Sequence, residues 1–164
     1  MGAVVDLAEL ARHRADWRRR SQRLVLTNGC FDIMHLGHVR YLQAAKALGD
    51  VLVVGVNSDA STRRLKGERR PIVPQAARAE VLAALGCVDF VIVFDEDTAE
   101  ALVLALRPEV YVKGGDYASG KPLPEAAAVA TYGGQVAILP EVAGASSTDI
   151  VERIVERYCG RSPS

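Results

Sequence analysis

Two histidines that flank a glycine are the residues of this chain best suited to chemistry on a phosphate. His35 and His38 enclose Leu36 and Gly37, soon after an apolar run that ends at Thr27. The pattern predicts that a helix begins at about Gly37, and the first turn of a helix presents unpaired N–H groups and partial positive charge. Two imidazoles beside those groups can hydrogen-bond to phosphate oxygens. We therefore predict a phosphate site at this turn.

Two other roles for these histidines stay open at this stage. They could form a partly buried structural pair, or they could join Cys30 in a zinc site, although no fourth ligand lies near in the sequence. The three cysteines, Cys30, Cys87 and Cys159, are far apart and form no Cys-x-x-Cys pair. Neither a disulfide framework nor a zinc ribbon is expected, and we predict no metal site built from protein ligands alone.

A run of cations follows the second apolar segment. Residues 63–70 read Arg-Arg-Leu-Lys-Gly-Glu-Arg-Arg, five cations in eight positions. Lys66 can approach a polyphosphate as a point charge, while Arg69 or Arg70 can bind two oxygens with one guanidinium. Arg78, farther along, is a weaker candidate. A solvated basic loop is the alternative, but the position after a strand favours contact with phosphate.

Two further segments contain residues that can hold a nucleotide. Residues 112–117 read Val-Lys-Gly-Gly-Asp-Tyr, in which the glycines let the backbone bend against a flat ligand and Asp116 can bind hydroxyls or a base edge. Residues 145–149 read Ala-Ser-Ser-Thr-Asp, and hydroxyls at a helix start serve equally as caps and as phosphate ligands. Each pattern alone is also typical of an ordinary turn or cap. Their combination indicates a nucleotide site.

The elements that must position these residues alternate along the chain. Continuous apolar segments indicate strands covered on both faces, at residues 23–27, 51–57, 90–94, 110–113 and 135–139. Helical patterns separate or flank them, at residues 6–20, 37–48, 75–85, 98–106, 124–132 and 147–158. The alternation predicts an α/β fold, a Rossmann-like doubly wound parallel sheet of about five strands. Ligands bind such sheets beyond the carboxyl ends of the strands.

Length and composition predict one domain. A chain of 164 residues can bury a sizeable core without disulfides or a structural metal. We expect an extra amphipathic helix within residues 1–22 that packs on the outside, the main domain over residues 23–159, and a disordered tail over residues 160–164.

Charge and hydropathy exclude other classes of protein. Twenty Lys and Arg balance twenty Asp and Glu, so the chain lacks the positive field of a dedicated nucleic-acid binder. Arg18, Arg19 and Arg20 are expected on a solvated helix face rather than on RNA. No apolar run approaches the length of a membrane span, and acidic residues interrupt the N-terminus where a signal peptide needs an apolar core. We expect a cytoplasmic protein with no membrane partner.

Residues 28–153 resemble the cytidylyltransferase-like nucleotidyltransferases, whose hallmarks are His-x-Gly-His after the first strand and a late Ser/Thr-rich element. The strings at 27–32, 56–61, 64–68 and 112–117 are similar, more closely, to the adenylyltransferase domains of ADP-heptose synthases. The one departure is Ser146-Ser147-Thr148, which stands where relatives usually carry Ser-Thr-Thr and keeps every hydroxyl. The resemblance implies transfer of AMP from ATP to D-glycero-β-D-manno-heptose 1-phosphate, with Mg²⁺ bound with ATP. The sugar kinase often fused ahead is not seen, so no kinase activity is expected.

The resemblance also implies roles for individual residues. A sugar phosphate is itself nucleophilic, so positioning and charge neutralisation suffice for catalysis. The implied catalytic residues are His35, His38 and Lys66. The implied nucleotide-binding residues are Asn28, Gly29, Cys30, Phe31, Gly37, Lys113, Gly115, Asp116, Ser146, Ser147 and Thr148. The implied acceptor-binding residues are Asp32, Asn57, Arg69 and Arg70.

Two alternatives to this activity stay open. One is a CTP-dependent cytidylyltransferase that acts on glycerol 3-phosphate or another small alcohol phosphate, because the phosphate machinery is shared. The other is a non-catalytic nucleotide- or RNA-binding module, because a fold does not determine a function. The expected partners are ATP and a sugar 1-phosphate, with no nucleic acid, and homo-oligomerisation stays open.

Overall fold

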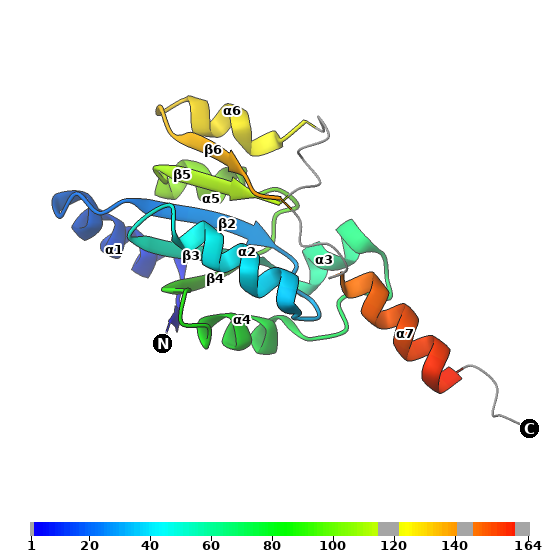
Figure 1. Ribbon diagram of the computed structural model, residues 1–164. Helices are drawn as coiled ribbons and strands as arrows, with labels where there is room; N and C mark the ends of the chain where they lie inside the picture. Colours follow the sequence, from blue (N-terminus) through cyan, green and yellow to red (C-terminus); the bar gives the residue numbers. More distant parts are fainter. Residues whose placement is uncertain (1, 115–121, 141–145, 160–164) are drawn as a thin grey trace, which may run out of the picture.

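One parallel sheet of six strands organises the protein (Figure 1). The computed structural model describes residues 2–114, 122–140 and 146–159. The strands are β1 (Ala3–Val4), β2 (Leu24–Gly29), β3 (Val51–Asn57), β4 (Phe90–Phe94), β5 (Val110–Lys113) and β6 (Gln135–Ile138). Their order in space is β1-β4-β3-β2-β5-β6, and every neighbouring pair is parallel. The predicted fold class is confirmed, and β1 is the strand that the sequence did not predict.

Helices cover both faces of this sheet. They are α1 (Leu7–Arg19), α2 (Leu36–Lys46), α3 (Asp59–Lys66), α4 (Gln75–Ala83), α5 (Glu100–Leu106), α6 (Pro124–Ala130) and α7 (Ser147–Cys159). Alternate residues of β2 enter two different cores, since Leu24 and Leu26 pack with α1 and α5 whereas Val25 packs with α2 and α4. This two-sided burial explains why the strands are continuously apolar. Among the described helices, none is long and apolar enough to cross a membrane.

Helix α1 belongs to one of these cores. Leu10 and Trp17 are buried against the sheet, and Arg14 donates hydrogen bonds to Leu106 O (2.8 Å) and to the Glu109 carboxylate (2.5 Å). Glu109 in turn accepts from Leu24 N at 2.7 Å, so α1 is tied to the first residue of β2. Helix α1 thus covers one face of the sheet through these three residues, while most of its other side chains are exposed or half-buried. The expected tail, residues 160–164, lies outside the described residues.

Helix α3 replaces part of an expected loop at residues 58–74. Ser58 caps it by accepting a hydrogen bond from Ser61 N (3.1 Å), Asp59 lies in its first turn, and three cations lie in its last turn. These charges match the helix dipole. The helix could not be predicted from the sequence because Leu65 is the one large apolar residue in it. A helical period becomes visible only when several apolar residues recur at helical spacing. The basic run therefore begins inside a helix.

The strand order reverses between β2 and β5. From β2 the chain proceeds outward through β3 and β4, whereas β5 and β6 lie on the other side of β2. A crevice for ligands forms at such a reversal, outside the carboxyl ends of the two strands. Residues 30–35 follow β2 there, and Gly114 follows β5. In Figure 1 α7 also begins near this edge and extends away from the sheet.

Candidate functional site

The two histidines lie together where α2 begins. Their ring centroids are 3.8 Å apart with the planes 26° from parallel, and the Phe31 ring meets His38 edge-on at 5.3 Å. His35 occupies the N-cap position with an extended backbone, but its side chain does not cap the helix. Within the described structure, Nδ1 of each ring is buried and has no hydrogen-bond partner. Such unsatisfied buried atoms are uncommon and are typical of a ligand site.

Burial favours the neutral form of both imidazoles. Burial, assisted by the charge of His35, lowers the pKa of His38 to about 4. Burial also lowers the pKa of His35, and the negative charge of Asp149 opposes that shift. A neutral imidazole has one N–H donor and one acceptor, so each ring can still donate one hydrogen bond to a phosphate oxygen.

The Ser/Thr-rich element lies against the same loop. Ser147 Oγ, at the start of α7, donates a hydrogen bond to Ile33 O at 3.2 Å. Ser146 Oγ accepts from Asp149 N at 3.0 Å, which is the capping role that the sequence left open. Thr148 is exposed. The N-termini of α2 and α7 thus converge on residues 30–35, and both present unpaired N–H groups.

The basic run divides into paired and unpaired cations. Arg64 Nε donates to Asp97 Oδ1 at 2.7 Å, and Arg70 Nη1 donates to Asp32 Oδ2 at 2.5 Å. Within the described part of the chain, Lys66 and Arg69 form no ion pair. Lys66 lies close enough to Lys113 for its charge to lower the pKa of that ammonium group. Lys66 and Arg69 therefore remain candidates for contact with phosphate.

Lys113 is the last residue of β5 and lies at the reversal of strand order. Burial lowers its pKa, while the charges of Glu125 and Cys30 oppose the shift. Glu125, which the sequence did not single out, is only 2% exposed and accepts a hydrogen bond from Ala99 N at 2.9 Å. Its position on α6 gave no signal in the sequence. The other predicted residues of this segment, Gly115 and Asp116, lie outside the described residues.

The predicted residues at the ends of β2 and β3 hold the framework. Asn28 Oδ1 accepts from Tyr111 Oη at 2.6 Å. Asn57 Nδ2 donates to Ser61 Oγ at 3.0 Å and to Glu96 O at 3.3 Å, so its amide contacts α3 and the segment after β4. Gly29 and Gly37 lie at the two ends of the segment of residues 30–35 that follows β2, which we call the histidine loop. A Cβ on Gly29 would meet the Phe31 ring at 3.2 Å.

One framework residue escaped the sequence analysis entirely. Tyr41 of α2 shares a 2.6 Å hydrogen bond with Thr27 Oγ1 and donates to Val112 O at 3.1 Å. It therefore joins α2, β2 and β5 directly behind the site, and burial raises the pKa of its hydroxyl. A lone tyrosine in an amphipathic helix carries no signal that could have identified this role.

Metal ligands are sparse in this region. Among the described residues, no group of three or more His, Cys, Asp or Glu side chains could hold a metal ion, and the zinc set of Cys30, His35 and His38 is included in that finding. The site instead offers imidazoles, hydroxyls, ammonium groups and helix N-termini. These groups bind phosphate oxygens.

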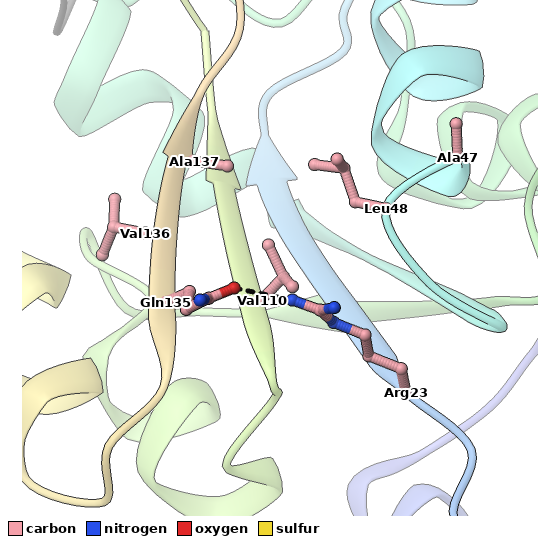
Figure 2. Close-up of a pocket in the computed structure, with 7 residues that line it drawn as sticks. All are labelled: Arg23, Ala47, Leu48, Val110, Gln135, Val136 and Ala137. Atoms are coloured by element: carbon pink, nitrogen blue, oxygen red, sulfur yellow. Dashed lines mark hydrogen bonds between the residues drawn. The ribbon is translucent and has the colours of Figure 1, made fainter.

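A separate depression in the described surface lies away from this site. It has a volume of about 500 Å³ and lies where β2, β5 and β6 begin, at the edge of the sheet away from the histidines (Figure 2). Arg23 and Gln135 join across it through a 2.6 Å hydrogen bond, and its remaining lining residues are Ala47, Leu48, Val110, Val136 and Ala137. It has no pair of groups suited to acid–base or phosphate chemistry, so the histidine loop remains the candidate site.

Comparisons with known proteins identify the family of the chain. The family model described as cytidylyltransferase-like matches residues 26–153. The chain is 54% identical over 145 residues to the bifunctional protein HldE of Syntrophotalea carbinolica, with 86% of this chain and 29% of that protein covered. HldE of Geobacter sulfurreducens is 51% identical over 155 residues, with coverages of 94% and 31%. The chain thus spans about three tenths of the length of these curated relatives.

Solved structures give the same result for the fold. The crystal structure of the lipopolysaccharide core biosynthesis protein from Thermoplasma volcanium matches with a TM-score of 0.58 and 32% identity, and covers 74% of this chain and 97% of that chain. Pantoate-beta-alanine ligase from Francisella tularensis matches with a TM-score of 0.60 over 99% of this chain and 80% of that chain. Because its identity is 12%, the second match bears on the fold alone.

Proposed function

Because the chain belongs to the cytidylyltransferase-like family and is a nucleotidyltransferase, we propose that it transfers AMP from ATP to D-glycero-β-D-manno-heptose 1-phosphate, producing ADP-heptose and pyrophosphate. The observation that carries this proposal is the convergence of two helix N-termini on one loop with two neutral, stacked histidines. The choice of substrate is supported by about half identity to HldE proteins and by similarity to a lipopolysaccharide core biosynthesis protein.

The site would act by holding the triphosphate and stabilising charge. The N–H groups at the start of α2 and α7 would bind the phosphate oxygens, and Lys66 would approach them from the end of α3. An oxygen of the sugar phosphate attacks the α-phosphorus while the bond to pyrophosphate breaks in line. His35 and His38 would donate hydrogen bonds to oxygens that gain charge in that transition state. No side chain forms a covalent intermediate.

The residues fit a magnesium ion that arrives with ATP. Mg²⁺ is usually held by substrate phosphates, waters and one or two carboxylates rather than by a protein cage. Asp149 follows Ser147, whose Oγ contacts Ile33 O at 3.2 Å, by two residues, and it would supply one such carboxylate. The Asp32 carboxylate is already occupied by Arg70 and two backbone N–H groups. When bound, the ion neutralises charge on the departing pyrophosphate.

The test is pyrophosphate release measured with paired substrates. ATP and CTP are each combined with the heptose 1-phosphate and with glycerol 3-phosphate, and His38→Ala protein supplies the background rate. We expect ATP with the heptose 1-phosphate to give the highest kcat/KM. Faster turnover of CTP with glycerol 3-phosphate would establish the cytidylyltransferase alternative. Nucleotide binding without turnover of any pair would establish a binding module.

A further inference from the structure

One buried carboxylate fastens the end of the basic run to the histidine loop. Asp32 is 8% exposed; its Oδ2 accepts from Arg70 Nη1 at 2.5 Å, and its Oδ1 accepts from Ile72 N at 2.8 Å and Val73 N at 2.9 Å. Both oxygens are therefore occupied by the protein. We propose that Asp32 and Arg70 are positioning residues that latch residues 70–73 onto the loop carrying His35, rather than ligands of the acceptor. The proposal rests on the adenylyl transfer proposed above.

Buried Arg78 joins the same two segments through hydrogen bonds to their backbone oxygens. Arg78 is 1% exposed and donates hydrogen bonds to Cys30 O, to Val73 O at 2.9 Å and to Asp59 Oδ1 at 2.8 Å. Asp59 also accepts from Gln75 N at 2.8 Å. Cys30 and Asp32 lie on either side of Phe31, so Arg78 and Arg70 hold the loop on both sides of that residue. Arg78, a weaker phosphate candidate from the sequence, has its guanidinium committed to this contact.

The latch determines where the unpaired cations lie. Arg64 is held by Asp97 and Arg70 by Asp32, and Lys66 and Arg69 lie between or next to these anchored residues. A guanidinium whose charge is already neutralised by a buried carboxylate attracts a phosphate only weakly. Arg70 would thus act on the substrate through the placement of Lys66 and Arg69. Loss of Arg70 should lower turnover more than it weakens ATP binding.

A double-mutant cycle on Arg70→Gln and Asp32→Asn tests this coupling. In the wild-type background we expect Arg70→Gln to lower kcat by about tenfold, with the KM for ATP within about twofold, and Arg70→Lys to retain most of the activity. In the Asp32→Asn background the same change should cost less than about twofold. Arg19→Gln is the control, since it breaks an ion pair with Asp16 on α1, outside the basic run and the loop after β2, and it should leave kcat close to wild type. An equal loss in both backgrounds would show that Arg70 contacts substrate and would overturn the proposal.

Amide hydrogen exchange tests the contact between Asp32 and residues 70–73 without an activity assay. Amide hydrogen exchange at Ile72 and Val73 should accelerate by about tenfold or more in Arg70→Gln protein, although Arg70 does not bond to either amide. Unchanged protection in that variant would overturn the latch even if Asp32→Asn fails to fold. If no substrate pair is turned over, the proposed function fails while the exchange result still decides the latch.

Discussion

Replacing His38 with alanine separates a role in the transition state from a role in folding. The ring lies at the N-terminus of α2, is stacked on His35 and has a buried Nδ1 without a partner in the described structure. Loss of one preorganised donor to a transition state typically costs about 3 to 4 kcal/mol, which corresponds to a decrease in kcat of about a hundredfold or more. Because the ground-state triphosphate keeps its N–H and ammonium contacts, the KM for ATP should change little.

The effect on stability should be moderate and can be predicted from the ring contacts. His38 packs against His35 at 3.8 Å and against Phe31 at 5.3 Å between centroids, and aromatic pairs contribute about 0.5 to 1.5 kcal/mol each. The alanine variant should therefore lose about 2 kcal/mol of unfolding free energy at pH 8, where the imidazole is neutral. For a chain of this length the Tm should fall by about 4 to 8 °C.

His13→Ala is the control, because this histidine is also stacked but lies on α1. Its ring centroid is 4.7 Å from that of Phe90 and 5.7 Å from that of Trp17. The control should lower the Tm to a similar extent and leave kcat close to wild type. Initial rates of pyrophosphate release and thermal denaturation are measured on the same preparations. A His38→Ala protein with normal kcat and a lowered Tm would refute the catalytic assignment.

Three further predictions follow from charges and burial. Lys66→Ala should lower kcat/KM by about ten- to a hundredfold, since a charge-assisted contact contributes about 1.5 to 3 kcal/mol, and unchanged kinetics would mean that Lys66 is solvated. Arg78→Met should lower the unfolding free energy by about 3 to 5 kcal/mol in chemical denaturation, because it removes the cation paired with Asp59 and the donor to Cys30 O and Val73 O; a loss below about 1 kcal/mol would contradict the bracing role. His38 has a pKa of about 4 in the folded protein and about 6.5 when unfolded, so the unfolded state binds the proton first as the pH falls. Its contribution to stability is complete above about pH 6.5 and is lost as the pH falls toward 4, and denaturation curves of His38→Ala protein should lack that part of the decline.

The sequence predicted those parts of the fold that depend on local patterns. Strands β2 to β5 were found because both of their faces are largely buried, which makes them continuously apolar. Strand β6 is mostly exposed, and its short apolar run alone identified it. Strand β1 has only two residues, Ala3 and Val4, and its pairing with β4 depends on a segment more than eighty residues away. Helix α3 was missed because charge dominates its composition, so no apolar period was visible. Strand β1 depends on pairing with the distant β4, and helix α3 depends on its cap at Ser58 and on its charges. Neither feature appears as an apolar period in the sequence.

The residues of the site were predictable only in part, because some of their roles depend on local sequence patterns and others depend on the fold. Side-chain type and position after a strand predicted that His35, His38 and Ser147 lie at one edge of the sheet. In the structure Ser147 Oγ donates a hydrogen bond to Ile33 O, two residues before His35. Type and position cannot show which groups are already neutralised by the protein. Arg70 and Asp32 are 38 residues apart in the sequence, and only the fold brings them to 2.5 Å.

Among the residues that the sequence singled out for the site, hydrogen bonding within the protein therefore distinguishes those that are free to bind a ligand from those that hold the framework. Asp32, Asn57 and Arg78 all have protein partners at hydrogen-bonding distance, and a ligand would have to displace those partners at the cost of unpaired buried groups. The imidazoles of His35 and His38 instead have buried nitrogens without partners in the described structure, an arrangement that costs free energy unless a ligand completes it. A cluster of matching residue types in the sequence thus contains two populations with different roles. Substitutions in the first population should act on folding and loop placement, and substitutions in the second should act on the rate.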